Sequence, residues 1–269
     1  VVKELARWRF TGITGVNTLF NALLANDDFA RLDFSALKVA VAGGMALHHS
    51  VAERWQAVTG KPLVEGYGLS ETSPVVCCNP LDAPRIGSIG FPLPSTDIAI
   101  RENGTDMPFG EPGELCVRGP QVMRGYWNMP DETAQTLSED GWLRTGDVAQ
   151  VDEAGFVRIV DRKKDMIIVS GFKVFPNEIE DVVAAHDAVV EVGCVGVPDE
   201  RTGQAVKVFV VRKPGAEVSP EAIREYCRTS LTAYKVPRYV EFRDSLPKTN
   251  IGKILRRALV ENEGRRDAA

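Results

Sequence analysis

The chain has 269 residues, of which 44% are hydrophobic and 26% are charged, and its formal net charge is −5. These values are typical of a folded globular protein with one large domain or two smaller ones. The negative balance gives no general electrostatic attraction for nucleic acid, so a nucleic-acid partner is not predicted.

Cysteine and histidine usage argues against several kinds of site. The cysteines lie in apolar or helical surroundings without metal-ligand spacing, and their odd number argues against a complete disulfide framework. Reduced thiols in a cytoplasmic protein are predicted. Three histidines give little support to a His-rich zinc site or a Ser-His-Asp triad. Every apolar run is short and interrupted, which predicts no membrane-spanning helix. The cysteines are Cys77, Cys78, Cys116, Cys194 and Cys227.

The first part of the chain shows a β/α pattern. The run "LKVAVAGG" predicts a buried parallel strand, "ALHHSVAERWQAVTG" a helix capped by Gly60, and "PLVEGYG" a further strand. Sheets of this kind bind ligands beyond the carboxyl ends of their strands. Before them, "TGVNTLFNALLAN" predicts an amphipathic helix from the spacing of Val16, Leu19, Phe20, Leu23 and Leu24.

The pattern changes after about residue 85. From there to residue 161, short apolar runs alternate with Gly, Pro and Asn-Gly turns, which predicts an antiparallel or barrel-like unit. The sequence "DEAG" is its predicted last hairpin turn. The charged stretch "DRKKD" then predicts an exposed connection between domains.

The last part predicts a compact α+β domain. "MIIVSGFKVF" reads as a hairpin, and "PNEIEDVVAAH" as a helix with Ile179, Val182 and Val183 inward. "VVEVGCVGV", "AVKVFVV" and "YVEFRD" read as strands. Ser219 and Pro220 suit the N-cap and first position of another helix.

Two candidate binding stretches follow predicted strands. Gly43 and Gly44 would let a flat ring or a phosphate approach the backbone, although a plain tight turn explains them equally well. In "EGYGLSET", Tyr67 offers a stacking platform, Ser70 a hydroxyl for a phosphate oxygen, and Glu71 a hard oxygen ligand for Mg²⁺. A purely structural loop is the alternative interpretation.

Two weaker stretches fit the same kind of ligand. Asp147 in "RTGD" could accept hydrogen bonds from a ribose diol, although Gly-Asp is also a common turn. In "LPKTNIGKILRR", Gly252 allows an unusual backbone and Lys253 is a mobile cation for a phosphate, or the stretch is a surface loop leading into a solvated basic helix. Together the four stretches fit an adenine nucleotide with Mg²⁺.

Five motifs in order, "EGYGLSET", "GYWNMPDET", "GWLRTGD", "GFVRIVDRKKDMIIVSGFKVFPNEIE" and "LPKTNIGKILRR", resemble the adenylate-forming superfamily. This group includes acyl-CoA synthetases, luciferases and peptide-synthetase adenylation domains. The stretches "VNTLFNALL", "GPQVMRGYW" and "YKVPRYVEFRDSLPKTNIGKILRRAL" are most similar to the bacterial long-chain fatty-acid–CoA ligase branch.

The resemblance implies a fold and a reaction. The fold is α/β and α+β: residues 1–84 as a partial β/α subdomain and 85–161 as a β-barrel-like subdomain of the AMP-binding domain, then 162–269 as a small mobile C-terminal domain. The reaction joins a long-chain fatty acid to ATP, releasing pyrophosphate, and CoA then displaces AMP. A CoA ligase for a medium-chain, aryl or 4-coumarate-like acid, and a non-catalytic AMP-binding fragment, remain alternatives.

The resemblance also implies residue roles. Tyr67 would stack on adenine, Ser70 would touch the α-phosphate, Glu71 would hold Mg²⁺, and Lys253 would bridge the carboxylate and the α-phosphate. Lys164 would be the hinge residue, within residues 161–165. Asp147 and Arg162 would bind the ribose, and Gly171 and Lys173 would border the pantetheine tunnel. Other residues implied at the nucleotide are Gly43, Gly44, Met45, Glu65, Gly66, Gly68 and Leu69. Arg256 and Arg257 would be solvated, the favoured interpretation, or near the CoA phosphates.

Departures from the family pattern set limits on these expectations. Ser70 replaces the usual Thr and keeps its hydroxyl, whereas Met45 is larger than the usual residue and could reshape the adenine or acyl wall. The family's Ser/Thr/Gly-rich phosphate loop is not found in this sequence. We therefore expect the chain to be the C-terminal half of an enzyme whose N-terminal half is its missing partner, with little adenylation when isolated. Peripheral contact with the inner face of a membrane is compatible with a long-chain substrate.

Overall fold

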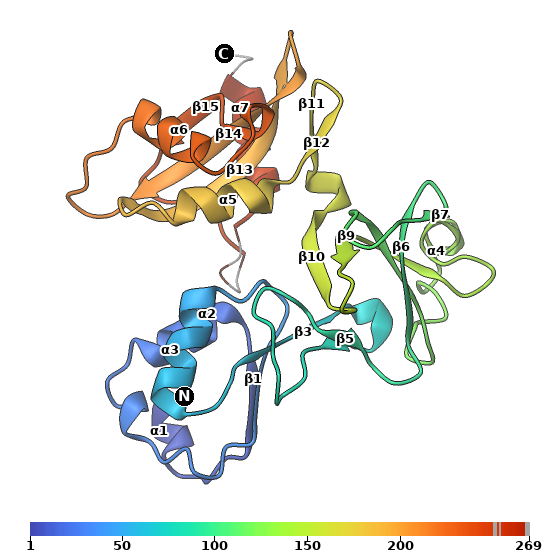
Figure 1. Ribbon diagram of the computed structural model, residues 1–269, viewed down its shortest axis with the longest axis vertical. Coiled ribbons are helices and arrows are strands. Elements are labelled where there is room, and N and C mark those ends of the chain that lie inside the picture. The colour runs from blue at the N-terminus through green and yellow to red at the C-terminus, as the bar shows by residue number, and fades with distance from the viewer. Residues whose placement is uncertain (250–251, 253, 267–269) are drawn as a thin grey trace. The chain divides into compact units, whose positions relative to one another are not determined.

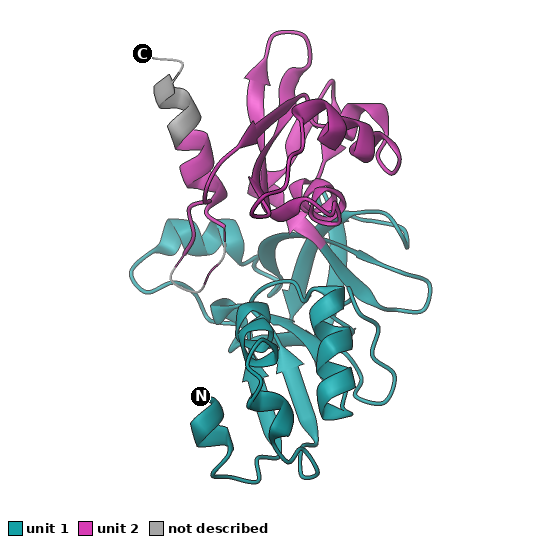
Figure 2. Cartoon of the chain, turned by 90° about the vertical axis from the view of Figure 1, so that its left-hand side faces the viewer, with its two compact units in different colours: residues 1–159 teal, residues 160–269 magenta. Residues whose placement is uncertain are grey.

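The computed structural model describes residues 1–249, 252 and 254–266. Within them, the strands pair into three five-stranded sheets (Figure 1). Side chains are described as far as residue 261. The chain divides into two compact units, Val1–Ile159 and Val160–Ala269 (Figure 2). Two sheets belong mainly to the first unit and one to the second.

The first sheet has the order β1-β2-β3-β4-β5. Its first three strands are parallel, with Ala42 of β2 opposite Glu65 of β3, and the last two are antiparallel. The predicted parallel strands β2 and β3 are therefore confirmed; β4 was not predicted, and β5 lies in the turn-rich stretch that was predicted to be antiparallel. The strands are β1 (Gly12–Gly15), β2 (Val39–Ala42), β3 (Val64–Gly68), β4 (Val75–Cys78) and β5 (Phe91–Pro92).

Helices α1 (Val2–Leu5), α2 (Asn17–Leu24) and α3 (His49–Thr59) accompany this sheet. Phe20 of α2 meets Trp55 of α3 edge to face, with 5.0 Å between ring centroids, and both side chains are fully buried. The predicted amphipathic helix is confirmed. Gly60 ends α3 with φ 70°, a left-handed conformation that glycine adopts without steric cost, so the predicted cap is also confirmed.

The second sheet has the order β10-β9-β8-β6-β7. Its pairings of β6 with β7, β6 with β8 and β8 with β9 are all antiparallel, as the turn-rich sequence predicts. The strands are β6 (Asp97–Glu102), β7 (Thr105–Asp106), β8 (Gly113–Arg118), β9 (Leu143–Val151) and β10 (Val157–Arg162). The predicted boundary between residues 84 and 85 runs inside the first sheet, because β5 follows it.

Helix α4 (Pro130–Thr136) was not predicted. Its sequence nevertheless contains two helix-start signals: Pro130 at the first position, and acidic Asp131 and Glu132 in the first turn. The helix is only two turns long and buries none of its residues, so no apolar periodicity marks it.

The second unit is built on the sheet β12-β11-β14-β13, with β15 parallel to β14. Helices α5 (Pro176–Ala184), α6 (Pro220–Arg228) and α7 (Arg256–Arg266) accompany it. Every strand and helix predicted for this part up to residue 249 is confirmed, and Ser219 caps α6 by accepting the Ala222 N–H at 3.1 Å. The strands are β11 (Ile167–Val169), β12 (Phe172–Val174), β13 (Val189–Asp199), β14 (Gly203–Arg212) and β15 (Tyr239–Phe242).

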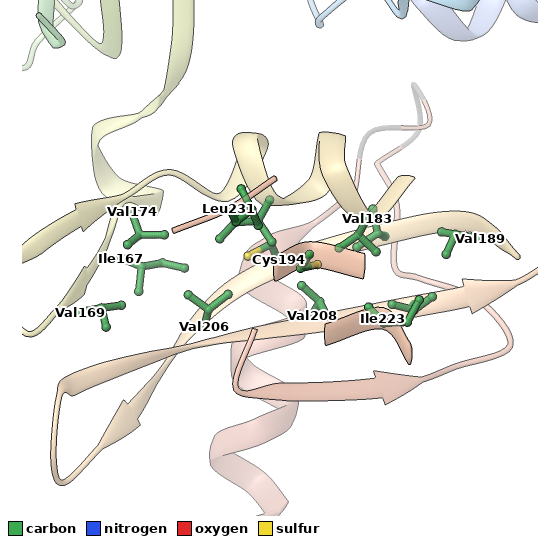
Figure 3. Packing of buried hydrophobic residues seen from close by; sticks show 14 residues of the cluster. Ile167, Val169, Val174, Val183, Val189, Cys194, Val206, Val208, Ile223 and Leu231 are labelled. Carbon is green, nitrogen blue, oxygen red and sulfur yellow. The ribbon is translucent and has the colours of Figure 1, made fainter. Parts of the chain in front are cut away.

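Both faces of this sheet are covered. Cys194 and Val208 pack with the inner sides of α5 and α6, in the cluster that Figure 3 shows. Their neighbours along the strands, Val195 and Phe209, point to the opposite face and pack with Leu259 of α7. Because both faces are buried, β13 and β14 read as continuous apolar runs rather than as alternating ones.

One prediction about the charged stretch "DRKKD" was wrong. Asp161 is only 1% exposed, and its carboxylate accepts the backbone N–H groups of Arg162 and Asn177, each at 2.7 Å. Arg162, Lys163 and Lys164 are exposed as expected. A run of charge does not reveal which of its members is turned inward to accept backbone hydrogen bonds.

Gly68 ends β3 where no side chain fits, because a Cβ there would lie 1.8 Å from the carbonyl oxygen of Pro74. Replacing Gly68 by Ala must move backbone, so we expect Gly68→Ala to lower the free energy of unfolding by about 3 kcal/mol or more. Urea unfolding followed by tryptophan fluorescence measures this.

The matched control is Gly110→Ala. A Cβ at Gly110 meets no atom within 4 Å, and only its φ of 83° is unfavourable for alanine, which costs about 1–2 kcal/mol. Equal destabilisation by the two substitutions would contradict the close approach at Gly68.

Candidate functional site

The candidate site in the first unit begins where two parallel strands end side by side. Gly43 and Gly44 follow β2, and Tyr67 and Gly68 are the last residues of β3. A Cβ at Gly43 would lie 3.2 Å from the carbonyl oxygen of Gly66, so the two backbones approach closely. Gly44 has φ 76°. The carboxyl ends of these strands thus carry glycines, at the edge where β/α sheets bind ligands.

Glu65 holds the loop beyond β2 in place. Its carboxylate is 7% exposed and accepts the Leu47 N–H at 3.1 Å with one oxygen and the Gly87 N–H at 2.8 Å with the other. Burial raises the pKa of this carboxyl above its usual value. Both oxygens are engaged with the backbone, so Glu65 shapes the turn that contains Met45, whose side chain is half-buried.

Tyr67 and Asp147 meet although 80 residues separate them in the chain. The Tyr67 hydroxyl donates to Oδ2 of Asp147 at 2.6 Å. Burial, and then the neighbouring Asp147 charge, raise the pKa of Tyr67, so the phenol remains a donor. Asp147 is 7% exposed, and its N–H donates to Oγ1 of Thr145 at 3.1 Å. The bond fixes both the aromatic ring and the carboxylate at the end of the first sheet.

The short turn Ser70–Thr72 follows β3 directly. The Ser70 side chain is exposed, and that of Glu71 is half-buried. Thr72 is fully buried and ties the turn together, since its hydroxyl accepts the Leu69 N–H at 3.0 Å and donates to the Pro74 carbonyl at 2.6 Å. The turn is therefore a rigid support for the exposed hydroxyl and the carboxylate beside it.

Tyr126 is a site residue to which the sequence reasoning gave no role. Its hydroxyl donates to Oε1 of Glu71 at 2.8 Å, and this hydrogen bond is the main cause that raises the pKa of Tyr126. The Met123 N–H donates to the Glu71 carbonyl at 2.8 Å. The motif "GYWNMPDET" was noted, but only the structure shows that its tyrosine orients the Glu71 carboxylate.

Glu71 is compatible with Mg²⁺. Among residues 1–249, 252 and 254–266 no group of three or more His, Cys, Asp and Glu side chains is arranged to hold a metal ion. Mg²⁺ in nucleotide sites needs fewer protein ligands, because one or two carboxylates together with phosphates and water complete its octahedron. The donor set that Glu71 offers therefore fits Mg²⁺ only together with a phosphate ligand.

Other predicted residues lie in the second unit. Arg162 ends β10, and Lys164 lies in the short turn Lys163–Asp165; both side chains are exposed. Gly171 has φ 85° in the turn between β11 and β12, and exposed Lys173 follows on β12. Lys253 lies outside the described residues. Within the first unit, the structure joins Tyr67 to Asp147 and brings Gly43 close to Gly66.

Within the described part of the chain, no helix is both long and apolar enough to cross a membrane. None of the five cysteines, all of which lie within the described residues, forms a disulfide bond.

The chain is similar to known proteins along nearly its whole length. The family model "AMP-binding enzyme" matches residues 1–127, and "AMP-binding enzyme C-terminal domain" matches residues 178–253. A long-chain-fatty-acid–CoA ligase of Yersinia pestis is 60% identical over 100% of this chain and 48% of that protein. The chain thus spans about half the length of the curated relatives it matches.

Solved structures agree with these matches. ATP-bound MatB from Rhodopseudomonas palustris has a TM-score of 0.88 at 33% identity, over 97% of this chain and 52% of that one. The o-succinylbenzoate CoA synthetase MenE from Bacillus subtilis, in complex with its acyl-adenylate intermediate, has a TM-score of 0.86 at 30% identity, over 96% and 52%.

Glu65→Gln tests the carboxylate that holds the loop beyond β2. Glutamine has one acceptor oxygen, so one of the two backbone N–H groups loses its partner. We expect the free energy of unfolding to fall by about 1–3 kcal/mol. Urea unfolding measures it, and Glu53→Gln is the control, since its side chain is 63% exposed.

The raised pKa of Glu65 also predicts how the stability difference between the wild type and Glu65→Gln changes with pH. Because the folded-state pKa of Glu65 is raised, the folded protein keeps this proton to a higher pH than the unfolded chain does. The contribution of Glu65 is fully present below the unfolded pKa and declines as pH rises through the folded value. The stability advantage of the wild type over the Glu65→Gln variant should therefore shrink as pH rises above about 4.5; an advantage that grows with pH would contradict this.

Proposed function

This chain belongs to the family of AMP-binding, adenylate-forming enzymes, and we propose that it forms the C-terminal part of a long-chain fatty-acid–CoA ligase. The complete enzyme converts a long-chain fatty acid, ATP and CoA into acyl-CoA, AMP and pyrophosphate. The relatives are about twice as long as this chain, so the proposal concerns the activity of the complete native protein.

The hydrogen bond from Tyr67 to Asp147 is the observation that carries the proposal. An aromatic ring suited to stack on a purine and a carboxylate suited to accept from a ribose diol are fixed together beside the strand ends. Gly43 and Gly44 follow the adjacent strand β2 and present no side chain there. This arrangement supports an adenosine site in which the ring covers the base and Asp147 accepts from the ribose hydroxyls.

The first half-reaction forms an acyl-adenylate. A fatty-acid carboxylate oxygen attacks the α-phosphorus of ATP, the bond from that phosphorus to the bridging oxygen breaks, and pyrophosphate leaves. Ser70 donates to an α-phosphate oxygen, and Lys253 lies between the two anions, where its charge lowers their repulsion. Exposure of Ser70 on a rigid turn supports its role.

Glu71 would be the protein ligand of Mg²⁺. The bound metal neutralises phosphate charge. Tyr126 donates to one carboxylate oxygen of Glu71 and so fixes how the carboxylate is presented. The chain therefore supplies one oriented carboxylate at this position.

The second half-reaction uses the second unit, which we propose is the small mobile C-terminal domain. It turns about a hinge at Lys164 and exchanges the Lys253 segment for the β11–β12 turn. Gly171 and Lys173 then border the pantetheine arm of CoA, while Arg162 lies beside the ribose during adenylation. The CoA thiolate attacks the acyl carbonyl carbon, and AMP leaves. The exposed side chains of Lys164 and Lys173 are compatible with both roles.

A long-chain acid is favoured over the other acids. The ligase from Yersinia pestis at 60% identity is named for long-chain fatty acids, whereas MenE, named for an aromatic acid, is 30% identical. Contact with a membrane surface through the acyl substrate belongs to the same proposal. Competition among acids of different chain length, in the complete protein, separates long-chain from medium-chain and aryl activity.

Tyr67→Phe tests the nucleotide role of the first unit. Removing the hydroxyl leaves the Asp147 carboxylate without its donor, and a hydrogen bond to a charged group contributes about 1.5–3 kcal/mol. We expect kcat/KM for ATP in ATP–pyrophosphate exchange to fall at least about tenfold, with the KM for the fatty acid changed less than about twofold. Tyr239→Phe, at an exposed position of β15, is the control. Unchanged exchange in Tyr67→Phe would contradict the assignment.

Lys253→Ala tests the proposed division of labour between the half-reactions. Loss of the cation should slow acyl-adenylate formation at least about 100-fold, as removal of one charge-stabilising group does in other enzymes. Thioester formation from supplied acyl-adenylate should stay within about threefold. Single-turnover assays of both steps measure this, with Lys213→Ala, an exposed lysine, as control. Equal losses in both steps would contradict the hinge, and no change in either would favour a non-catalytic AMP-binding protein.

A further inference from the structure

Arg256 begins α7, three residues after Lys253, and is not the solvated or CoA-facing residue predicted from the sequence. Its side chain is 16% exposed. Nε donates to one oxygen of Glu180 at 3.0 Å, and Nη2 donates to the other at 2.6 Å. Nη2 also donates to Oδ1 of Asn177 at 2.5 Å. The guanidinium therefore forms hydrogen bonds with two residues of α5, Glu180 and Asn177.

The same guanidinium reaches the first residues of the second unit. Nη1 donates to Oδ1 of Asp161 at 3.0 Å and to Oδ2 of Asp165 at 3.3 Å. Asp161 is 1% exposed and also accepts the Asn177 N–H at 2.7 Å. Thus Arg256 joins both ends of the segment 161–165, in which the hinge is proposed, to the start of α5.

The network is fixed from the sheet as well. Oε1 of Glu180 accepts the Cys194 N–H of β13 at 2.7 Å. The Asn177 side chain donates to the Val160 carbonyl at 2.9 Å. Arg256 thus contacts α5 and the end of β10, and α5 is itself hydrogen-bonded to β13 and β10. These contacts restrain the backbone next to Arg256.

The residues just before Arg256 pair with residues on the other side of Lys253 in the sequence. Lys248 and Ile254 pair in an antiparallel bridge, and the Leu255 N–H donates to the Pro247 carbonyl at 2.8 Å. The Gly252 N–H donates to the Thr249 carbonyl at 2.9 Å. Lys248, Ile254 and Leu255, which lie on either side of Lys253 in the sequence, are therefore fixed next to Arg256.

An arginine suits this position and a lysine does not. One guanidinium faces the three carboxylates of Asp161, Asp165 and Glu180, and its planar fork of donors reaches all of them together with Asn177. An ammonium group keeps the charge but has only three donors around one point. Arg257, the next residue, is 89% exposed and pairs with Glu261 four residues on, which fits the solvated interpretation.

We propose that Arg256 is a positioning residue that couples the Lys253 segment to both ends of the hinge segment 161–165. The role of Lys253 and the hinge rest on the proposed function; the coupling itself rests on the hydrogen bonds above. Arg256 touches no substrate in this account. It sets where the Lys253 ammonium lies relative to the axis about which the second unit turns.

Arg256→Lys tests the coupling in the complete native protein, with Arg257→Lys as matched control. Arg256→Lys keeps a cation among the three carboxylates, so the unit should remain folded. We expect acyl-adenylate formation to slow at least about tenfold in kcat, with the KM for ATP and the rate of thioester formation from supplied acyl-adenylate within about twofold. Arg257→Lys should change neither step.

A double variant separates positioning from folding. If Arg256 acts through Lys253, then Arg256→Lys combined with Lys253→Ala should be no slower in adenylation than Lys253→Ala alone, within about twofold. A folding defect would instead lower both half-reactions together and multiply with the Lys253→Ala loss. Either of those results would overturn the proposal.

Amide hydrogen exchange makes the coupling testable apart from the activity. In Arg256→Lys, exchange should speed up at least about tenfold at both residues 161–165 and residues 247–255, and Arg257→Lys should match the wild type. Unchanged exchange at either segment would overturn the coupling, whatever the activity. Faster exchange at both segments in Arg256→Lys, combined with a wild-type protein that forms no acyl-adenylate, would support the coupling and refute the proposed function.

Discussion

The hydrogen bond between Tyr67 and Asp147 is the contact on which the candidate site depends. It joins the end of β3 in the first sheet to β9 in the second, so two sheets built by different parts of the sequence share one fixed point. The Tyr67 hydroxyl stays protonated and the Asp147 carboxylate is nearly buried, so water does not compete for this hydrogen bond. The glycines beyond β2 and the turn at Ser70–Thr72 are placed around this point.

Buried acidic side chains have supporting roles in both units. In the first unit, Glu65 uses both oxygens to accept backbone N–H groups and so shapes the turn beside the strand ends. In the second, Asp161 and Glu180 accept backbone N–H groups and also bind Arg256. Burying a carboxylate is costly unless such partners exist. The partners are found here at loops whose shape matters for the proposed chemistry.

Much of the fold could be predicted because the apolar patterns are local. The parallel strands β2 and β3, the cap at Gly60 and the inward residues of α5 follow from spacing and turn chemistry alone. Helix α4 was missed because an exposed two-turn helix has no apolar face to signal it. Strand β4 was missed because its short run stands between Pro74 and Pro80.

The site could be predicted only in part, for a physical reason. Residue types suggested Tyr67, Glu71 and Asp147, but contacts between residues far apart in the chain leave no mark on local sequence. The pairing of Tyr126 with Glu71 and the burial of Arg256 among three carboxylates are both of this kind. The sequence does not distinguish a solvated arginine from one that is held by ion pairs. It therefore favoured the wrong interpretation of Arg256.

A crystal structure of the complete native protein with a long-chain acyl-sulfamoyl-adenosine, a stable mimic of the acyl-adenylate, tests the central claim most directly. The account predicts the adenine against the Tyr67 ring and the glycines at residues 43 and 44, with the ribose hydroxyls within hydrogen-bond distance of Asp147. A ligand bound elsewhere, or a ribose that leaves Asp147 untouched, would contradict it.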